Sequence, residues 1–202
     1  MSNIVIKGAA TGSGTFTLEA PATNTNRALV LPDEAGTVLT SVSNIAAANL
    51  TGALLSSAMP AGSVLRVVSA VVASATSTQS QAFINTPLAL AITPTSASSK
   101  ILILISAPIY SQSGGTYSAR YAIFRGTVSG ANLGNSSTGF ANIWSGGGTA
   151  LSITMSMMYL DSPNTTSSQT YTVGMRNEGN SQTSEIMSSN TPATITLMEI
   201  AT

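Results

Sequence analysis

The stretch Lys100-Ile101-Leu102-Ile103-Leu104-Ile105 decides the fold that this sequence predicts. Branched aliphatic side chains favour a β-strand, and because apolar residues fill both sets of alternating positions, both faces of this strand should be buried. The run Ile101–Ile105 is far too short to cross a lipid bilayer. We therefore expect a central strand that is covered on one face by an opposite sheet and on the other by a neighbouring subunit.

Similar segments occur at regular spacing on both sides of this stretch. Turns rich in Gly, Pro, Asn or Asp separate them, for example Ser113-Gly114-Gly115 and Asp161-Ser162-Pro163-Asn164. The expected strands are residues 64–73, 81–92, 100–107, 116–125, 138–144, 151–160, 169–176 and 194–200. This spacing predicts an all-β fold in which residues 64–202 form an antiparallel β-sandwich of the jelly-roll type.

The first part of the chain has a different pattern. Residues 1–40 alternate like short strands, and a segment of this size needs disulfides, a metal or partner chains to bury a core. Residues 41–63 carry no charge and are interrupted by Gly52 and Pro60. We expect an N-terminal β module at 1–40, followed by a neck at 41–63 that winds in extended form around partner chains, with a short helix as the alternative form of the neck.

The composition narrows the classes of function. The chain has no His, no Cys, seven basic and seven acidic residues, and a formal net charge of zero. Without Cys there is no disulfide, thiolate nucleophile or Cys-bound zinc, and without His the usual general base is missing. We therefore expect no enzymatic activity, no metal and no cofactor. A chain without a basic surface is also not expected to bind nucleic acid, nothing predicts membrane insertion, and so little charge favours self-association.

Two sets of residues are candidates for a site. Asp161 together with Glu178 or Glu185 could form the carboxylate pair of a polysaccharide-degrading enzyme, although carboxylates in turns usually accept backbone hydrogen bonds. Aromatic and amide side chains near loops are the candidate receptor-facing residues, with rings that cap the core as the alternative: Trp144, Tyr110, Tyr117 and Asn164. Arg120 and Arg125, five positions apart, should lie on opposite faces of one strand, each with an acidic or intersubunit partner.

Several phrases of the sequence resemble fibre proteins of tailed bacteriophages, particularly phages of aquatic bacteria. The N-terminal phrases are Ser2-Asn3-Ile4-Val5-Ile6-Lys7-Gly8, the run from Gly14 to Arg27, and the run from Leu29 to Thr40. The distal phrases are the run from Ala91 to Leu102, Tyr159-Leu160-Asp161-Ser162-Pro163, and Ile195-Thr196-Leu197-Met198-Glu199-Ile200. The resemblance implies a homotrimer that docks on the virion by its N-terminus, points its sandwich outward, and has no enzymatic activity and no cofactor.

The resulting prediction is a short trimeric fibre on the surface of the phage particle, synthesised in the host cytoplasm. Its partners would be itself, other virion proteins of the tail or capsid, and a glycan or protein of the host cell surface. The apolar residues of the N-terminal strands are the candidate virion-docking residues: Ile4, Ile6, Phe16, Leu18, Leu29 and Leu31. The alternatives are a capsid-decorating head fibre or cement protein that stabilises the particle, and a polysaccharide-degrading spike.

Overall fold

The computed structural model describes residues 11–15, 22, 59–112, 117–145, 150–179 and 183–202, with only the backbone of Gln112, Tyr117 and Ser145. The chain divides into two compact units, Met1–Thr51 and Gly52–Thr202. The expectations for the N-terminal β module, for all but the last residues of the neck, and for the six docking residues lie outside the described residues. The fold below is that of the second unit.

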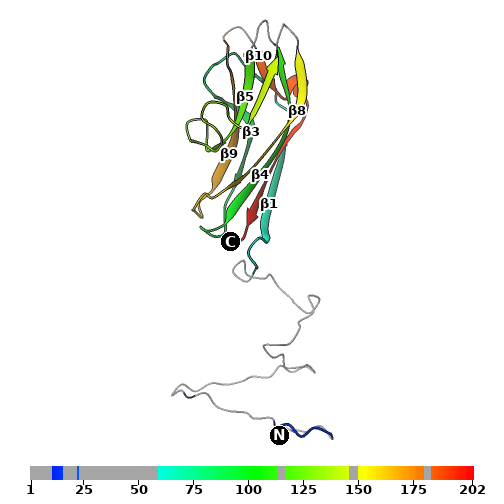
Figure 1. The fold of residues 1–202 in the computed structure, drawn as a ribbon, viewed down its shortest axis with the longest axis vertical. Helices are drawn as coiled ribbons and strands as arrows, with labels where there is room; N and C mark the ends of the chain where they lie inside the picture. Colours follow the sequence, from blue (N-terminus) through cyan, green and yellow to red (C-terminus); the bar gives the residue numbers. More distant parts are fainter. Residues whose placement is uncertain (1–10, 16–21, 23–58, 113–116, 146–149, 180–182) are drawn as a thin grey trace. The chain divides into compact units, whose positions relative to one another are not determined.

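Eight long strands form this unit, and each lies where the sequence predicts one (Figure 1). They are β1 (Val64–Val72), β3 (Ile84–Ile92), β4 (Lys100–Gln112), β5 (Tyr117–Arg125), β7 (Ala141–Ser145), β8 (Leu151–Asp161), β9 (Gln169–Asn177) and β11 (Ala193–Ile200). Short elements that the sequence did not predict accompany them: β2 (Thr76–Thr78), β6 (Ala131–Asn132), β10 (Thr183–Ile186) and a 3-10 turn, η3 (Ser188–Asn190).

The strands form two antiparallel sheets. The first sheet has the order β1-β11-β4-β8, and the second has the order β3-β9-β5-β7, with β6 beside β5. Consecutive long strands lie in different sheets, except for β5 and β7, which pair directly, and this is the strand order of an eight-stranded jelly roll. The predicted all-β sandwich of jelly-roll type is present in the described residues.

Strand β4 is the centre of the first sheet, as its sequence predicts. β8 pairs with one side of it from Ile101 to Ser111, while β11 and then β10 pair with the other side. Its odd-numbered side chains, including Ile101, Ile103 and Ile105, are buried against the second sheet. Leu102 and Leu104, on the other face, are only half-buried. Burial of that second face by a neighbouring subunit remains a prediction.

The core lies between the two sheets. Side chains from the first sheet meet those of β3, β5 and β9, and the largest fully buried ones are Tyr121, Tyr171, Leu88, Ile101, Ile103, Ile109, Ile123, Met175, Ile186, Met187, Ile195 and Leu197. Met155 and Met157 of β8 join this core, whereas Met158 points away from it and has an exposed fraction of 67%. The alternation along β8 thus places one methionine on the outer face of the sheet.

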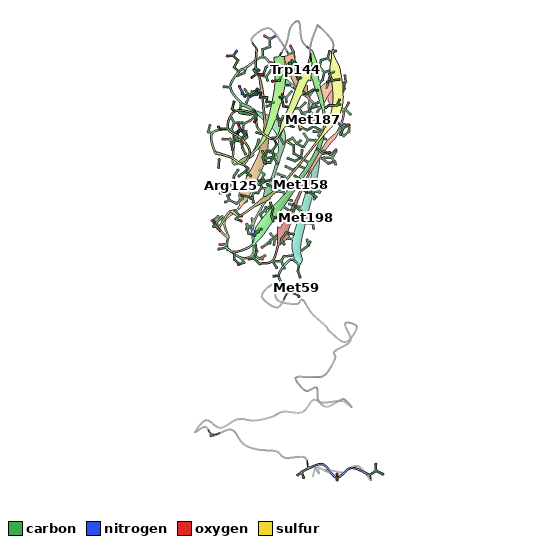
Figure 2. The ribbon with its side chains drawn as sticks, viewed as in Figure 1. Met59, Arg125, Trp144, Met158, Met187 and Met198 are labelled. Carbon is green, nitrogen blue, oxygen red and sulfur yellow. The ribbon has the colours of Figure 1, made fainter. Side chains whose placement is uncertain are left out.

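The jelly roll has two distinct ends. At the proximal end, Gly62 N donates to Ala201 O (2.8 Å) and Ala201 N donates to Ser63 O (2.9 Å), so the chain leads into β1 beside the last strand. Met59 lies at this end and Trp144 lies at the opposite, distal end (Figure 2). A surface side chain at the distal end is therefore separated by the length of the jelly roll from the point where the chain enters it.

Candidate functional site

The four candidate receptor-facing residues divide between the two ends. Trp144 is on β7 at the distal end, and Tyr110 is near the distal end of β4, where it pairs with Glu185 of β10 and Ser152 of β8. Asn164 follows β8, whose last residue Asp161 pairs with Ile101 at the proximal end of β4. The nine positions from Ile101 to Tyr110 span about 30 Å of extended strand, so Asn164 cannot share one site with Tyr110.

Trp144 is the most exposed aromatic side chain of the described residues, with an exposed fraction of 64%. It pairs with Ser118 of β5, and paired residues of an antiparallel sheet point to the same face. Because Ser118 faces away from the core, so does the indole ring of Trp144. The ring therefore does not cap the core, which was the alternative interpretation of this position. Tyr110 is half-buried, and the Tyr117 side chain is outside the described residues.

A polar network lies beside Trp144 on this outer face of the second sheet. Ser118 Oγ donates to Glu178 Oε2 (2.6 Å), and Arg120 Nη2 donates to Glu178 Oε1 (2.5 Å). Arg120 Nη1 also donates to the carbonyl oxygen of Ser137 (2.9 Å). The hydrogen bond from Ser118, together with the charge of Arg120, holds the pKa of the Glu178 carboxyl below its ordinary value although desolvation opposes this. The network fixes an ionised carboxylate next to an exposed indole.

Arg176 extends the network across β9. Its guanidinium donates to the carbonyl oxygens of Gln81 (3.0 Å) and Ser137, and lies 5.5 Å from the ring centroid of Phe83. Desolvation and the nearby charge of Arg120 lower the pKa of Arg176, and Glu178 acts in the opposite sense. Both arginines are thus held by protein groups, and their bonds orient them on the surface.

Asn142 completes the surface and was missed from the sequence. It is exposed, lies two positions before Trp144 on β7, and pairs with Arg120 of β5. Alternation along β7 could have identified it, because residues two apart on a strand share a face. An exposed indole flanked by an amide and a carboxylate can stack on the apolar face of a sugar or peptide and hydrogen-bond to its polar groups. We call Trp144, Asn142, Ser118, Arg120 and Glu178 the distal surface.

Asp161 has a structural role between the two sheets. Arg125 of β5 donates to both of its carboxylate oxygens, with Nε 2.8 Å from Oδ2, and the Tyr171 hydroxyl of β9 donates to Oδ2 (2.7 Å). Asp161 itself is buried. Arg120 and Arg125 therefore point to opposite sides of β5 and each has an acidic partner, as their spacing predicts.

The predicted carboxylate pairs do not form. Asp161 bonds to Tyr171 near the start of β9, whereas Glu178 follows the end of β9, about 23 Å away along the strand. Glu185 pairs with Tyr110 and Asp161 pairs with Ile101, which places these two carboxylates about 30 Å apart along β4. Catalytic carboxylates of glycosidases lie within about 10 Å of each other. The pairing of Asp161 with either glutamate was therefore wrong, because turn residues at opposite ends of long strands are far apart.

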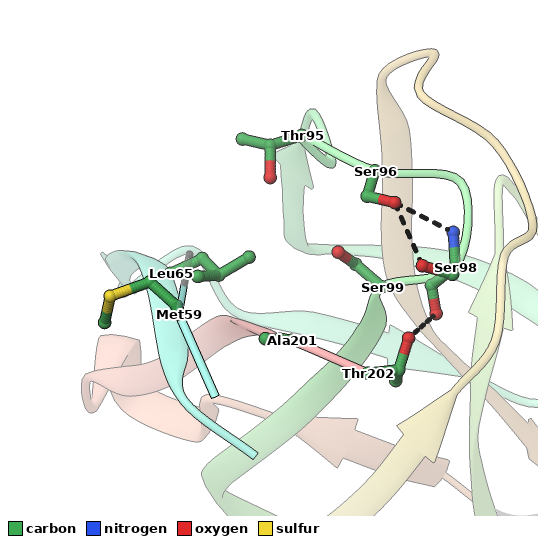
Figure 3. Close-up of a pocket in the computed structure, with 8 residues that line it drawn as sticks. All are labelled: Met59, Leu65, Thr95, Ser96, Ser98, Ser99, Ala201 and Thr202. Carbon is green, nitrogen blue, oxygen red and sulfur yellow. Dashed lines mark hydrogen bonds between the residues drawn. The ribbon is translucent and has the colours of Figure 1, made fainter. Parts of the chain in front are cut away.

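Other features of the described residues do not form a second site. A hollow of about 430 Å³ at the proximal end is lined by hydroxyls that already have partners (Figure 3): Ser96 Oγ lies 3.0 Å from Ser98 Oγ, Thr202 Oγ1 donates to Ser98 O (2.8 Å), and Thr95 Oγ1 donates to Glu199 Oε1 (2.7 Å). Over the part of the chain that the structure describes, no group of three or more acidic side chains could hold a metal ion. In the same residues, no helix has the length and apolar character needed to span a membrane.

The fold and the distal surface define an all-β jelly-roll protein with an exposed aromatic platform. Neither a family model nor a curated protein matches the sequence. Among solved structures, the infectious bursal disease virus Gx strain is similar at 12% identity and a TM-score of 0.35, over 76% of this chain and 43% of that one. The Gt strain is similar at 10% identity and a TM-score of 0.28, over 69% of this chain and 39% of that one.

A mutant VP2 protein of the same virus, in T=1 particles, is 10% identical with a TM-score of 0.27, over 69% of this chain and 38% of that one. The chain thus spans less than half the length of these three proteins. At these TM-scores the likeness carries no argument about the role of the chain.

Proposed function

We propose that this chain is a structural protein of a bacteriophage virion, a short homotrimeric fibre that docks on the particle by its N-terminus and binds the host surface with its jelly roll. One observation carries the proposal. The chain enters the jelly roll at the proximal end, while the exposed indole of Trp144 lies at the distal end. A chain anchored by its first residues would therefore present the distal surface outward.

The chemistry of the distal surface suits a glycan or a polar protein surface of the host. Trp144 offers an exposed ring for stacking, and Asn142 and Glu178 offer hydrogen-bonding groups beside it. Arg120 and Glu178 are paired there and Arg176 leaves a single net positive charge, so attraction at long range is weak. Each site would bind weakly, and three sites on one fibre with many fibres on one particle would make attachment effective through avidity.

A binding experiment tests this function. The full-length chain is applied to arrayed bacterial lipopolysaccharides and capsular polysaccharides, beside a Trp144→Ala variant. We expect W144A to reduce binding by about tenfold or more, because the loss at each site is multiplied by avidity. Asn164→Ala, at the proximal end, is the matched control and should bind like the wild type. Binding should change by less than about threefold between low and moderate salt.

The opposite results would reject the proposal. If W144A bound as the wild type does, the distal surface would not be the receptor site. If N164A alone lost binding, the proximal end would carry it. Antibody labelling of intact particles would place the protein: label on the tail supports the fibre, whereas label over the head shell would instead support a capsid-decorating protein.

A further inference from the structure

The outer face of the first sheet is an unusually apolar surface that nothing in the described chain covers. The strand register β1-β11-β4-β8 places four apolar side chains in one row across all four strands: Val67, Met198, Leu102 and Leu160. The next row is Ser69, Thr196, Leu104 and Met158, and the row after it is Val71, Thr194, Ser106 and Ser156. We call these three rows the apolar face.

The most exposed apolar side chains lie at the two edges of this face. On β1, Val67 and Val71 have exposed fractions of 53% and 68%, and on β8, Met158 and Leu160 have exposed fractions of 67% and 47%. The central side chains Leu102 and Leu104 are half-buried. Two apolar strips on opposite edges of one sheet can contact two different neighbours at once.

The absence of charged side chains from the apolar face indicates which partner the face can bind. None of the three rows contains a charged residue; on the same face, Lys100 lies beyond their proximal limit and Glu185, which pairs with Tyr110, lies beyond their distal limit. Arg66 of β1 reaches instead to the carbonyl oxygen of Thr93 (3.0 Å). The outer face of the second sheet, by contrast, carries Arg120, Arg176 and Glu178. A face of aliphatic, Ser and Thr side chains is complementary to another copy of itself, since it offers no charge for an oppositely charged partner to neutralise.

The size of the face fits the same partner. Four strands at about 4.8 Å spacing and three rows at about 6.8 Å spacing give a flat area of roughly 400 Å², before the relief of the side chains is counted. Monomeric proteins rarely expose apolar patches larger than a few hundred Å², and a stable interface takes about 800 Å² of accessible surface from each partner. The face therefore lies at the upper end of what a monomer exposes, and the contacts between copies would extend beyond the three rows.

A hollow of about 430 Å³ lies on this face, lined by Leu104, Ser106, Ser156, Met158, Thr194 and Thr196. It crosses β11, β4 and β8, and β1 lies outside it. A protruding valine of a β1 strand from another copy has the size and apolar character to occupy it. The exposed strip on β1 and the hollow beside β8 are thus alike in having no charge, and the valines of the strip are small enough to enter the hollow.

From these observations we propose that three copies of the chain associate through the apolar face, with the β1 strip of each copy packed against the β8 strip of the next. A head-to-tail contact closes into a ring when its rotation allows, and a rotation of about 120° per copy gives the ring of three that we propose. The inference rests on the homotrimer of the proposed function and adds the surface that forms it. It also gives Leu102 and Leu104 the subunit cover that the sequence of β4 predicts.

Cysteine cross-linking tests the geometry, because the chain has no cysteine of its own. Val67 and Leu160 are separated by two intervening strands, about 14 Å within one copy, which is too far for an intrachain disulfide. The double variants V67C/L160C and V71C/M158C of the full chain are oxidised and run on a non-reducing gel. We expect covalent species of two and three chains from a double variant and only single chains from each single variant.

Further variants serve as controls on the second sheet and test whether a charge placed on the apolar face disrupts the trimer. Asn142→Cys with Thr170→Cys should give no three-chain species. Met158→Glu should convert the native trimer to monomers, because it buries an unpaired charge, whereas Thr170→Glu on the second sheet should leave the trimer intact.

Each other outcome overturns a defined part of the proposal. Two-chain species from a single variant would mean a two-fold contact in place of the three-fold one. A wild-type trimer whose mass is unchanged by M158E, with no cross-linked trimer in either double variant, would reject the apolar face and leave the trimeric fibre standing. Loss of the trimer in M158E without cross-links in either double variant would keep the face but reject the contact of β1 with β8. A wild-type monomer would reject the trimer itself.

Discussion

At the scale of single residues, Asp161 links the two sheets. Its carboxylate belongs to β8, whereas its donors Arg125 and Tyr171 belong to β5 and β9. Burial raises the pKa of the Tyr171 hydroxyl far above its ordinary value, and its hydrogen bond to Asp161 acts in the same sense. The hydroxyl therefore stays protonated and remains a donor. A buried pair of this kind adds little net stability, but removing one partner leaves the other charge unpaired.

Asp161→Ala should therefore lower the free energy of unfolding by about 3 kcal/mol or more. Tyr171→Phe removes one hydrogen bond and leaves the ion pair, so it should cost about 1 kcal/mol. Urea unfolding of both variants, followed by circular dichroism, measures the two values. Equal effects of the two substitutions would show that the ion pair does not hold the sheets together.

Glu199 is a second buried carboxylate, on β11. Its Oε1 accepts from the backbone N of Thr95 (2.6 Å) and from Thr95 Oγ1 (2.7 Å). Burial acts to raise the pKa of Glu199, but the donors of Thr95, Ser99 and Ser96 outweigh it and hold the pKa below its ordinary value. The carboxylate thus ties the loop after β3 to the last strand.

This lowered pKa gives stability a defined pH dependence. Between the folded pKa and the ordinary value of 4.5, the unfolded chain binds more protons than the folded chain. The contribution of Glu199 is therefore complete above pH 4.5 and is lost as the pH falls through the folded pKa. Glu199→Gln should be less stable than the wild type at pH 7, and the difference should shrink on acidification. Denaturant unfolding from about pH 7 to about pH 3 measures this, and a constant difference would contradict it.

At the scale of elements, Gly174 of β9 shows how closely Phe124 and the segment after β5 pack on the outer face of the second sheet. A Cβ on Gly174 would lie 2.5 Å from Phe124 Cε2 and 2.8 Å from Val128 Cγ1. Glycine at this position therefore lets the Phe124 ring and the segment after β5 cover the strand. Phe124 in turn packs edge-on against Phe83, with 5.3 Å between ring centroids.

Gly174→Ala should lower the free energy of unfolding by about 1–3 kcal/mol, because the added methyl group overpacks the site. Gly14→Ala is the matched control: a Cβ on Gly14 would meet no heavy atom of the described residues within 4 Å, so this substitution should change stability by less than about 0.5 kcal/mol. Combining G174A with Phe124→Leu should recover part of the loss. If G174A unfolded at the same urea concentration as the wild type, the contact with Phe124 would not be tight.

The long strands could be predicted from the sequence, and the short ones could not. The run Ile101–Ile105 carries enough apolar residues to indicate both a strand and its burial. The stretch Tyr171–Met175 alternates and predicts a strand with one wetter face, but the structure buries both of its faces because Phe124 and Val128 cover the outer one. β2, β6 and β10 are two to four residues long and consist mostly of Ser, Thr, Ala and Asn, whose propensities favour turns as much as strands. Their pairing partners, not their own sequences, determine that they are strands.

At the scale of the whole molecule, the candidate site could be predicted only in part. Exposure of Trp144 depends on which face of β7 looks outward, and the register with β5 decides this. Sequence spacing likewise could not show that Asp161 and Glu178 lie at opposite ends of the jelly roll. Their separation follows from the length of β9 and from its pairing with the neighbouring strands. The double-sided apolar pattern of β4 indicated an apolar outer face, but its extent over β1 and β8 became visible only from the sheet order.

The charge distribution connects these scales. The described charges lie at the distal surface, on Glu185 of β10, between the sheets and at the proximal end, and the three rows of the apolar face contain none. A single copy would expose this face to water, whereas three copies would bury it and leave three distal surfaces at one end. Under this proposal, self-association and display would both follow from one arrangement of the two sheets.

The native mass of the full-length chain tests this account most directly. Sedimentation equilibrium at several concentrations should give about 61 kDa, three times the chain mass of 20.4 kDa, with no change on dilution through the micromolar range. A mass of 20.4 kDa at every concentration, from a chain that is folded by circular dichroism, would contradict it.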